Sequence, residues 1–553
     1  MKDLFRRIVF LILFLEIVCM IFAQTSPDWL WVSSASGSGG QIARCLSVDS
    51  DGNQYVTGSF ESITVFSEQT VTSAGNTDIY VGKLDSNGNW IWAQRAGGSE
   101  SDEPWGIALD ASSNIYITGT FSNTANFGEI EIGSEGNKDI FVAKLDNSGN
   151  WLWASGAGST GEDYGYSLTA LSDGTCYVTG YIYDTATFGE HQISPFGYTD
   201  IFLAQIGSDG IWQWVQRAGG TNLDKGKAVA TDHNGNVYLS GTFRNMGTFG
   251  ELSLSSNGQN DVFVAKLDAL GNWLWALNCG GSSYDDDVFD IDVNSSGVCC
   301  ITGEFYSTGV FGDIEITSSN NRDAFIAALD SLGNWLWATR AGGFGTDSGN
   351  SVVIDNNSAV YVSGNFQNTI DLGSLELSSS GIWDIFIAGI DSSGEWIWAD
   401  SAGSGANDFA GGIALGEENR IYVHGTFSGT SSFGEFELPT SGGFDIFVAK
   451  LSLAGISVED ELIPEFVSSA YLHNAIPNPV IKGSIVKVKT HLAVNESATL
   501  ELFNVRGQLL ATYPVFYGIQ THDFNSNNLS SGIYLYRLKT ANTSIVKKLT
   551  VIR

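Results

Sequence analysis

Aspartate is the residue through which this sequence is best equipped for chemistry, and it recurs at fixed positions. Six aspartates each follow the first tryptophan of a Trp-x-Trp frame by 12 residues. Carboxylates at such a spacing could bind a cation such as calcium, or could accept hydrogen bonds from loop amides. We favour the structural interpretation and keep a calcium site as the alternative. The six are Asp102, Asp163, Asp224, Asp285, Asp347 and Asp408.

Catalytic chemistry has weaker support. The turns of the type Asp-x-x-Gly-Asn, such as residues 49–53 and 85–89, lack the additional carboxylates of an EF-hand and are predicted to be hairpin turns. His191, His233 and His424 fall in three different repeats, and no serine or cysteine nucleophile frame accompanies them. We therefore assign no catalytic residue and predict no cofactor, with calcium as the one alternative.

Aromatic residues outside the frame are the candidates for ligand contact. Fourteen of the 16 tryptophans belong to the frame, and the other two are predicted to lie in loops on one rim of the fold. Two segments between repeats also depart from the common pattern, at residues 163–166 and 284–287. Variable loops on a rigid scaffold are the usual place for binding. The predicted ligand-binding residues are Trp105, Tyr164, Tyr166, Tyr284, Asp286 and Trp383.

The elements that position these residues form a repeat. The frame begins seven times, and its steps are 61, 61, 61, 61, 62 and 61 residues. A fixed period of this length indicates that one supersecondary unit has been copied into an array. The frame starts at Trp29, Trp90, Trp151, Trp212, Trp273, Trp335 and Trp396.

Each unit is predicted to be a four-stranded antiparallel sheet. In one copy the strands fall at residues 106–110, 114–121, 139–145 and 150–154, where apolar and polar residues alternate. Repeated radially, such sheets make a β-propeller. The last copy lacks a Trp-x-Trp strand, whereas the first such strand stands alone before the first full unit. We therefore predict an all-β protein with a seven-bladed propeller over residues 24–454, closed by its N-terminal strand.

The repeat resembles the SBBP family of β-propeller repeats. Its elements stand here as Gly-Asn-Gln-Tyr-Val-Thr-Gly at 52–58, Asp-Val-Phe-Val-Ala-Lys-Leu at 261–267 and Ala-Gly-Gly at 96–98. The resemblance covers residues 28–454 and recurs in every copy. It implies the propeller fold and leaves the function open.

The net charge and the N-terminal sequence limit the classes of partner that we expect. Residues 24–454 hold 14 basic and 52 acidic residues, a net charge of −38, which repels nucleic acid and anionic lipid. Residues 1–23 carry three basic residues and then an apolar run, and are predicted to be a signal peptide. Cys19 raises lipidation as an alternative. The five other cysteines do not repeat between units and are predicted to be small buried residues without disulfides.

The C-terminal region is a separate module. After an acidic linker at 455–470, residues 471–553 carry nine basic and three acidic residues and several short alternating segments, which predict a β-sandwich. The landmarks of this region, in order, are Pro477, Asn478, Pro479, Gly507, Gly532, Tyr534, Lys547 and Lys548. They resemble the C-terminal sorting domain of the type IX secretion system. The resemblance implies the secretion machinery as a partner.

These observations favour a non-enzymatic propeller on or outside the surface of a bacterium with an outer membrane. The predicted partner is an extracellular glycan or protein. A hydrolase or lyase that uses rim carboxylates and a structural surface-layer component are the alternatives. No nucleic-acid partner is expected, and the mature chain is predicted to lack a transmembrane span.

Overall fold

The computed structural model describes residues 27–453 and 470–552, with short gaps at 282–283, 320, 417–419, 442, 477–479, 483–484, 493–497, 505, 507, 516–517, 527–528 and 541–543. The predicted signal peptide, Cys19 and nearly all of the acidic linker lie outside the described residues. The chain divides into two compact units, Met1–Val458 and Glu459–Arg553. The regular elements of the described residues are β-strands.

The larger unit is built from one four-strand pattern. In one copy β8 (Glu103–Leu109), β9 (Ile115–Phe121), β12 (Asp139–Leu145) and β13 (Trp151–Ala157) pair antiparallel in that order. The Trp-x-Trp strand is thus the outer member of the sheet. The same order recurs along the chain. The sets are β2 (Gln41–Val48), β3 (Gln54–Phe60), β6 (Asp78–Leu84) and β7 (Trp90–Gly98); β14 (Tyr164–Ala170), β15 (Cys176–Ile182), β18 (Asp200–Ile206) and β19 (Trp212–Gly220); β20 (Lys225–Thr231), β21 (Val237–Phe249), β22 (Leu252–Leu267) and β23 (Trp273–Cys279); β24 (Asp287–Val293), β25 (Cys299–Phe305), β28 (Asp323–Leu329) and β29 (Trp335–Gly343); and β30 (Ser348–Ile354), β31 (Val360–Phe366), β34 (Asp384–Ile390) and β35 (Trp396–Ala402).

The two ends of this unit meet in one sheet. β1 (Asp28–Gly37) pairs antiparallel with β40 (Asp445–Ser452), which follows β36 (Phe409–Gly416) and β37 (Arg420–Phe427) in the order β36-β37-β40-β1. The predicted pairing of the first Trp-x-Trp strand with the last copy is therefore present. It covers what would otherwise be an open sheet edge.

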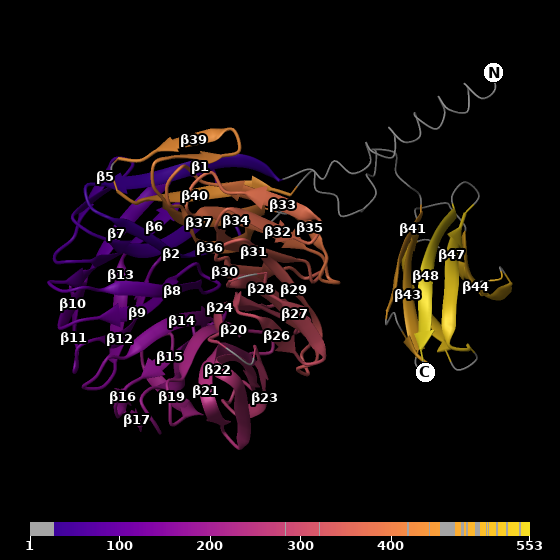
Figure 1. The fold of residues 1–553 in the computed structure, drawn as a ribbon, viewed down its shortest axis with the longest axis horizontal. Helices are drawn as coiled ribbons and strands as arrows, with labels where there is room; N and C mark the ends of the chain where they lie inside the picture. The colour runs from indigo at the N-terminus through magenta and orange to yellow at the C-terminus, as the bar shows by residue number, and fades with distance from the viewer. Residues whose placement is uncertain are drawn as a thin grey trace. The chain divides into compact units, whose positions relative to one another are not determined.

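The innermost strands form a closed cycle. β2 (Gln41–Val48) contacts β8, and contacts continue through β14 (Tyr164–Ala170), β20 (Lys225–Thr231), β24 (Asp287–Val293), β30 (Ser348–Ile354) and β36 back to β2. These strands lie in the middle of the larger unit, whereas β11 (Ile130–Gly133), β17 (His191–Ile193) and β27 (Ile314–Thr317) lie at its periphery (Figure 1). Sheets arranged radially around such a cycle make a β-propeller.

The sequence predicted that the long connections between the second and third strands are variable loops. This prediction is wrong, because the connections form regular hairpins. Residues 122–138 form the hairpin β10 (Thr124–Phe127) and β11 (Ile130–Gly133). β10 also pairs with the Gly97–Gly98 end of β7 (Trp90–Gly98) in the preceding sheet. Equivalent hairpins occur in the other copies, for example β26 (Thr308–Phe311) with β27 (Ile314–Thr317). The hairpins therefore join neighbouring sheets and belong to the scaffold.

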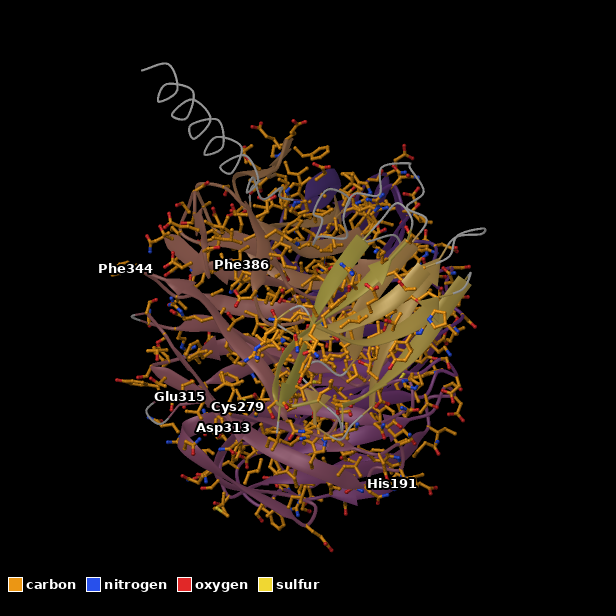
Figure 2. The ribbon with its side chains drawn as sticks, turned by 90° about the vertical axis from the view of Figure 1, so that its right-hand side faces the viewer. His191, Cys279, Asp313, Glu315, Phe344 and Phe386 are labelled. Carbon is orange, nitrogen blue, oxygen red and sulfur yellow. The ribbon has the colours of Figure 1, made fainter. Side chains whose placement is uncertain are left out.

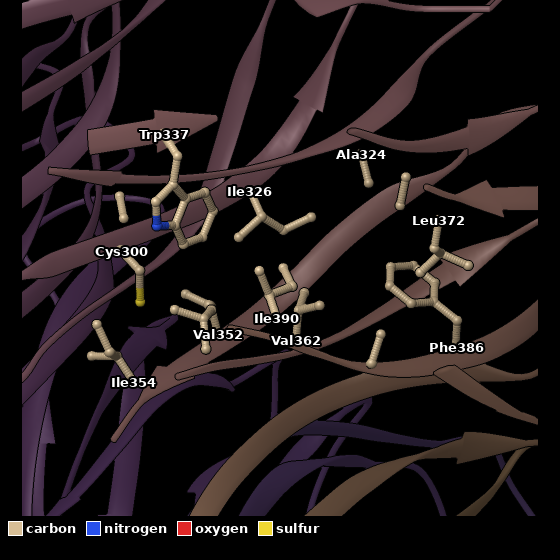
Figure 3. Packing of buried hydrophobic residues seen from close by; sticks show 14 of the residues in the cluster. Cys300, Ala324, Ile326, Trp337, Val352, Ile354, Val362, Leu372, Phe386 and Ile390 are labelled. Carbon is tan, nitrogen blue, oxygen red and sulfur yellow. The ribbon is translucent and has the colours of Figure 1, made fainter. Parts of the chain in front are cut away.

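The frame residues explain why the pattern is repeated. The rings of Phe127, from the hairpin, and Trp151, from the frame, meet edge to face with centroids 5.1 Å apart. Phe66 and Trp90 repeat the contact at 4.9 Å, and Phe311 and Trp335 at 5.2 Å. Between sheets the packing combines aliphatic and aromatic residues. Figure 3 shows one such cluster, in which Trp337 and Ile326 from one sheet face residues of the next.

The smaller unit is a two-sheet sandwich. One sheet has the order β41 (Ala470–Ile476), β43 (Ile485–Leu492) and β46 (Gly518–Asn525). The other has the order β42 (Val480–Ile481), β48 (Ser544–Ile552), β47 (Gly532–Lys539), β44 (Ala498–Asn504) and β45 (Leu509–Val515). Buried residues of both sheets form one cluster, which includes Val488 and Phe524 from the first sheet and Leu500, Tyr536 and Leu549 from the second.

Candidate functional site: the central channel

The repeated aspartates between sheets cap backbone amides. Asp102 is fully buried and accepts hydrogen bonds from the amides of Gly98 at 2.6 Å and Ser122 at 3.0 Å. Asp163 holds the amides of Ser159 and Tyr183 in the same way, at 2.5 and 2.7 Å. Each carboxylate thus ties the end of one sheet to the start of the next hairpin. This is the structural role that the sequence favoured.

The sequence spacing assigned the wrong residue in one copy. Asp286, and not Asp285, accepts the amides of Gly281 at 2.6 Å and Tyr306 at 3.1 Å, whereas Asp285 accepts the amide of Asn260. This copy holds the extra residue of the 62-residue step, so a count of 12 from Trp273 falls one position short. Asp286 is therefore a capping residue.

A second buried aspartate accompanies each cap. Asp78 begins the third strand of its sheet, and an added Cβ at Gly97, where φ is +131°, would lie 2.6 Å from Asp78 Oδ1 and 2.8 Å from Asp102 Oδ2. Only glycine fits between two carboxylates in this conformation. Burial raises the pKa of Asp102 to about 6, with the charge of Asp78 acting in the same direction and the capping amides opposing it.

No group of three or more His, Cys, Asp or Glu side chains among the described residues is placed to hold a metal ion. The cysteines bear equally little on metal chemistry. Cys45, Cys176, Cys279, Cys299 and Cys300 are all free, and all except Cys45 are buried. Cys45 is partly buried, and its desolvation raises its pKa to about 12; burial also raises the pKa values of the other four thiols. These thiols therefore remain protonated near neutral pH.

A cavity of about 640 Å³ lies within the cycle of innermost strands and is lined by residues from all of them. The lining position three residues after each capping aspartate, or after Gln41 in the first copy, carries a different residue in every copy. Two residues further along, every copy has Leu, Ile or Val. The divergent set is Arg44, Trp105, Tyr166, Lys227, Phe289, Asn350 and Gly411.

Four members of the divergent set, Arg44, Trp105, Tyr166 and Lys227, form a cluster of cations and aromatic rings that we call the channel mouth. The guanidinium of Arg44 lies 3.8 Å from the Trp105 ring centre, and the Trp105 and Tyr166 rings meet edge to face at 5.6 Å. The Lys227 ammonium lies 5.4 Å from the Tyr166 ring and 3.1 Å from a carboxylate oxygen of Asp287. In a domain with few basic residues, this concentration of positive charge is a local departure from the acidic surface.

A second cavity adjoins this cluster. It has a volume of about 540 Å³, and Tyr181, Tyr183 and Lys225 contribute to its lining. Tyr166, which lines the central cavity, and Tyr181 have ring centroids 5.8 Å apart. Tyr164 stacks on Tyr181 at 5.0 Å with an interplanar angle of 21°. Tyr166 of the first cavity and Tyr181 of the second are therefore neighbours.

The opposite wall of the channel carries buried carboxylates that are already engaged. Asp290 accepts hydrogen bonds from Ser351 Oγ at 2.7 Å and from the Val352 amide at 2.9 Å. Asp292 accepts the Ile354 amide at 2.9 Å, and burial raises its pKa to about 7. Both carboxylates bind β24 to β30 across neighbouring sheets.

The predicted aromatic contacts do not form one site. Trp105, Tyr164 and Tyr166 gather at the channel mouth. Trp105 lies in strand β8 and is partly buried, not in an exposed loop as predicted. Trp383 lies just before β34 (Asp384–Ile390) and packs on Phe409 at 6.2 Å.

Tyr284, in the connection that precedes β24, is exposed and lies against Tyr306 at 5.2 Å. The three histidines of this unit are also dispersed. His424 is fully buried, and its Nε2 lies 3.2 Å from the Tyr80 hydroxyl. Burial lowers the pKa of His424 to about 3, so it stays neutral. Figure 2 shows His191 well apart from Cys279.

The sorting landmarks are described only in part. Gly532 and Tyr534 lie in β47, and the Tyr534 hydroxyl donates to the Ser530 carbonyl at 2.8 Å. Lys547 and Lys548 lie in β48. Pro477, Asn478, Pro479 and Gly507 fall outside the described residues.

Comparison with known families agrees with this architecture. The family model of the secretion system C-terminal sorting domain matches residues 474–552, and the model of the SBBP β-propeller repeat matches residues 91–128. The chain carries a propeller repeat and a type IX sorting domain. The sorting domain indicates export to the cell surface. Across the described strands and loops, the structure has no helix long and apolar enough to cross a membrane.

The similar proteins are distant. An uncharacterised WD repeat-containing protein of Acanthamoeba polyphaga mimivirus is 23% identical over 432 residues, which cover 61% of this chain and 31% of that protein. The regulatory protein FlaEY of Caulobacter vibrioides is 29% identical over 199 residues, covering 34% of this chain and 20% of that protein. The chain therefore spans about a third or less of the length of these curated relatives.

Two solved structures are also only distantly similar to this chain. The structure of YCF48 bound to D1 peptide is 10% identical, with a TM-score of 0.37, and the match covers 78% of this chain and 98% of that chain. A gluconolactonase from Xanthomonas campestris is 11% identical, with a TM-score of 0.27, and the match covers 75% and 98%.

Sequence reasoning missed part of the channel mouth. Arg44, Lys225 and Lys227 were not selected, and neither was Tyr181. The signal was present, because aligning the copies on the period would have shown a column with no shared residue beside a column of shared aliphatic residues. The long connections, on which the predicted binding rim depended, are instead scaffold hairpins.

Proposed function

We propose that this protein is a non-enzymatic propeller that binds an extracellular glycan or protein at the mouth of its central channel. One observation carries the proposal. The copies share a frame but all differ at one channel-lining position, and the seven side chains of this divergent set line a cavity of about 640 Å³. A concave site with aromatic walls and a few polar groups is the usual form of a binding pocket.

The proposal includes the finer architecture. We assign seven blades to residues 24–454, a linker to 455–470 and the sorting module to 471–553. The secretion machinery would bind the sorting module. Cation binding by the capping aspartates is not needed for this function, since backbone amides already occupy their carboxylates.

Glycan arrays and surface pulldowns with the chain produced without residues 1–23 test the proposal. Trp105→Ala and Tyr166→Ala should abolish binding of whichever ligand is found, because aromatic anchors dominate such sites. Asn87→Ala, an exposed change in a hairpin turn on the opposite rim, is the matched control. Loss of binding in the control with retention in both channel variants would contradict the proposal.

A further inference from the structure

The geometry points to a glycan that carries a single carboxylated sugar as the ligand of the channel mouth. In this arrangement the carboxylate lies at Lys225, and the sugar ring lies against the neighbouring tyrosines. The inference rests on the proposed binding function and specifies its ligand class.

The mouth contains hydrogen-bond donors that lack acceptors. Arg44 Nε and Trp105 Nε1 are both buried and have no hydrogen-bond partner among the described residues. Both residues line the central cavity. A buried donor without an acceptor has lost its hydrogen bond to water and gained none in return. A ligand rich in acceptor oxygens would satisfy these donors, and a carboxylate or a sugar hydroxyl provides such oxygens.

The one basic residue that lines the second cavity has no ion-pair partner among the described residues. It is Lys225, and Glu162 and Asp184 line the same cavity without pairing with it. The nearby cations Arg44 and Lys227 are paired, with Glu103 at 3.7 Å and with Asp287 at 3.1 Å. Burial and the neighbouring Lys227 lower the pKa of Lys225, and the charge of Asp287 opposes that shift. A ligand carboxylate could therefore pair directly with the Lys225 side chain.

The aromatic walls fit a sugar ring. Lys225 lies 5.2 Å from the centre of the Tyr181 ring, so the cation and the aromatic surface are adjacent. Tyr164, Tyr166 and Tyr181 have mutual centroid distances between 5.0 and 5.8 Å. Aromatic side chains pack against the C–H face of a sugar, and the carboxylates of Glu162 and Asp184, which line the same cavity as Lys225, can accept its hydroxyl groups. This mixture of donors and acceptors suits a polyol better than an apolar ligand.

The acidic surroundings limit the ligand to few charges. The domain has 52 acidic and 14 basic residues, so a polyuronate or a nucleic acid would be repelled over most of its length. A glycan that is neutral except for one carboxylated sugar avoids this repulsion. It still gains the contact at Lys225.

Matched glycan pairs that differ only in the carboxylate provide the test. We would measure binding of the chain without residues 1–23 to 3′-sialyllactose and lactose, and to a glucuronide and the corresponding glucoside. The carboxylated member of at least one pair should bind at least about tenfold more tightly. Lys225→Gln should remove that difference and leave the neutral member unchanged. Arg420→Gln removes one positive charge at the hairpin end of β37, where its partner is Ser452, and should have no effect.

The outcomes separate the two claims. Equal binding of both members of each pair, or an unchanged preference in Lys225→Gln with an unchanged melting temperature, would overturn the carboxylate inference but leave glycan binding in place. Binding of a protein partner alone would overturn the inference and retain the proposed function. If neither glycans nor surface proteins bind, and channel variants change nothing, both claims fail.

Discussion

The outer Trp-x-Trp strands and the channel-lining strands belong to the same repeat, but they vary differently between copies. The outer strand keeps its tryptophans because each ring fills a fixed space beside a hairpin residue such as Phe127. In every copy the channel-lining strand has an aliphatic residue at the position that packs between sheets. At the divergent position, no two copies have the same residue. Shared residues thus maintain the scaffold, whereas the differences between copies mark the candidate site.

The largest expected effect comes from removing the strand that joins the two ends. Deleting residues 24–33 removes most of β1 and exposes the edge of β40. We expect loss of cooperative unfolding, with aggregation, because the edge becomes available for intermolecular pairing. Scanning calorimetry and light scattering measure this. A normal melting transition would show that the scaffold does not depend on closure.

A pair of tryptophan substitutions tests the contrast directly. Trp398 is 1% exposed and belongs to the frame, so Trp398→Ala should lower the free energy of unfolding by about 3–5 kcal/mol. Trp105→Ala should cost less, because its ring is only partly buried, but should abolish ligand binding. Urea denaturation and binding measurements on both variants provide the comparison. Equal stability losses would remove the distinction between frame and channel.

The capping aspartates should matter for stability and not for binding. Asp163→Ala leaves the amides of Ser159 and Tyr183 without their acceptor, so we expect a loss of about 1–3 kcal/mol. Asp285→Ala serves as a control from the same sequence position in another copy, where the residue is not a cap. Chemical denaturation measures both. A larger loss for Asp285→Ala would contradict the assignment of Asp286 as the cap.

The buried aspartates of the scaffold should also dominate the pH dependence of stability. The pKa values of Asp102, Asp139, Asp200, Asp224, Asp286 and Asp384 are raised to about 6, and that of Asp347 to about 7. The folded chain therefore binds more protons than the unfolded chain at intermediate pH, so stability rises as pH falls from about 7 towards 5. Hairpin-turn aspartates such as Asp85 and Asp146 have lowered pKa values, so their contribution is lost at still lower pH.

Melting temperatures between pH 4 and 8 test this expectation. In the channel, Asp292→Asn should reduce the pH dependence only slightly, since Asp292 is one of many such groups. A melting temperature that rises steadily up to pH 8 would show that these carboxylates are charged in the folded protein without a cost.

The smallest expected effect is that of metal removal. Because amides occupy the capping carboxylates, adding a chelator should leave the melting temperature unchanged. A decrease that calcium reverses would restore the calcium interpretation of Asp102 and its equivalents.

The sequence by itself determined the repeat, the four-strand unit and the sorting module, because periodic burial requires periodic apolar and glycine positions. Trp151 and Gly97 can be predicted as scaffold from the period alone. Only the tertiary structure decided where the copies' differences meet. Arg44 and Trp105 are 61 residues apart in the sequence and lie in contact at the channel. Residues one repeat apart become neighbours because the inner strands form a closed cycle. A local sequence pattern cannot predict that a cation and an aromatic ring from successive copies line the same cavity.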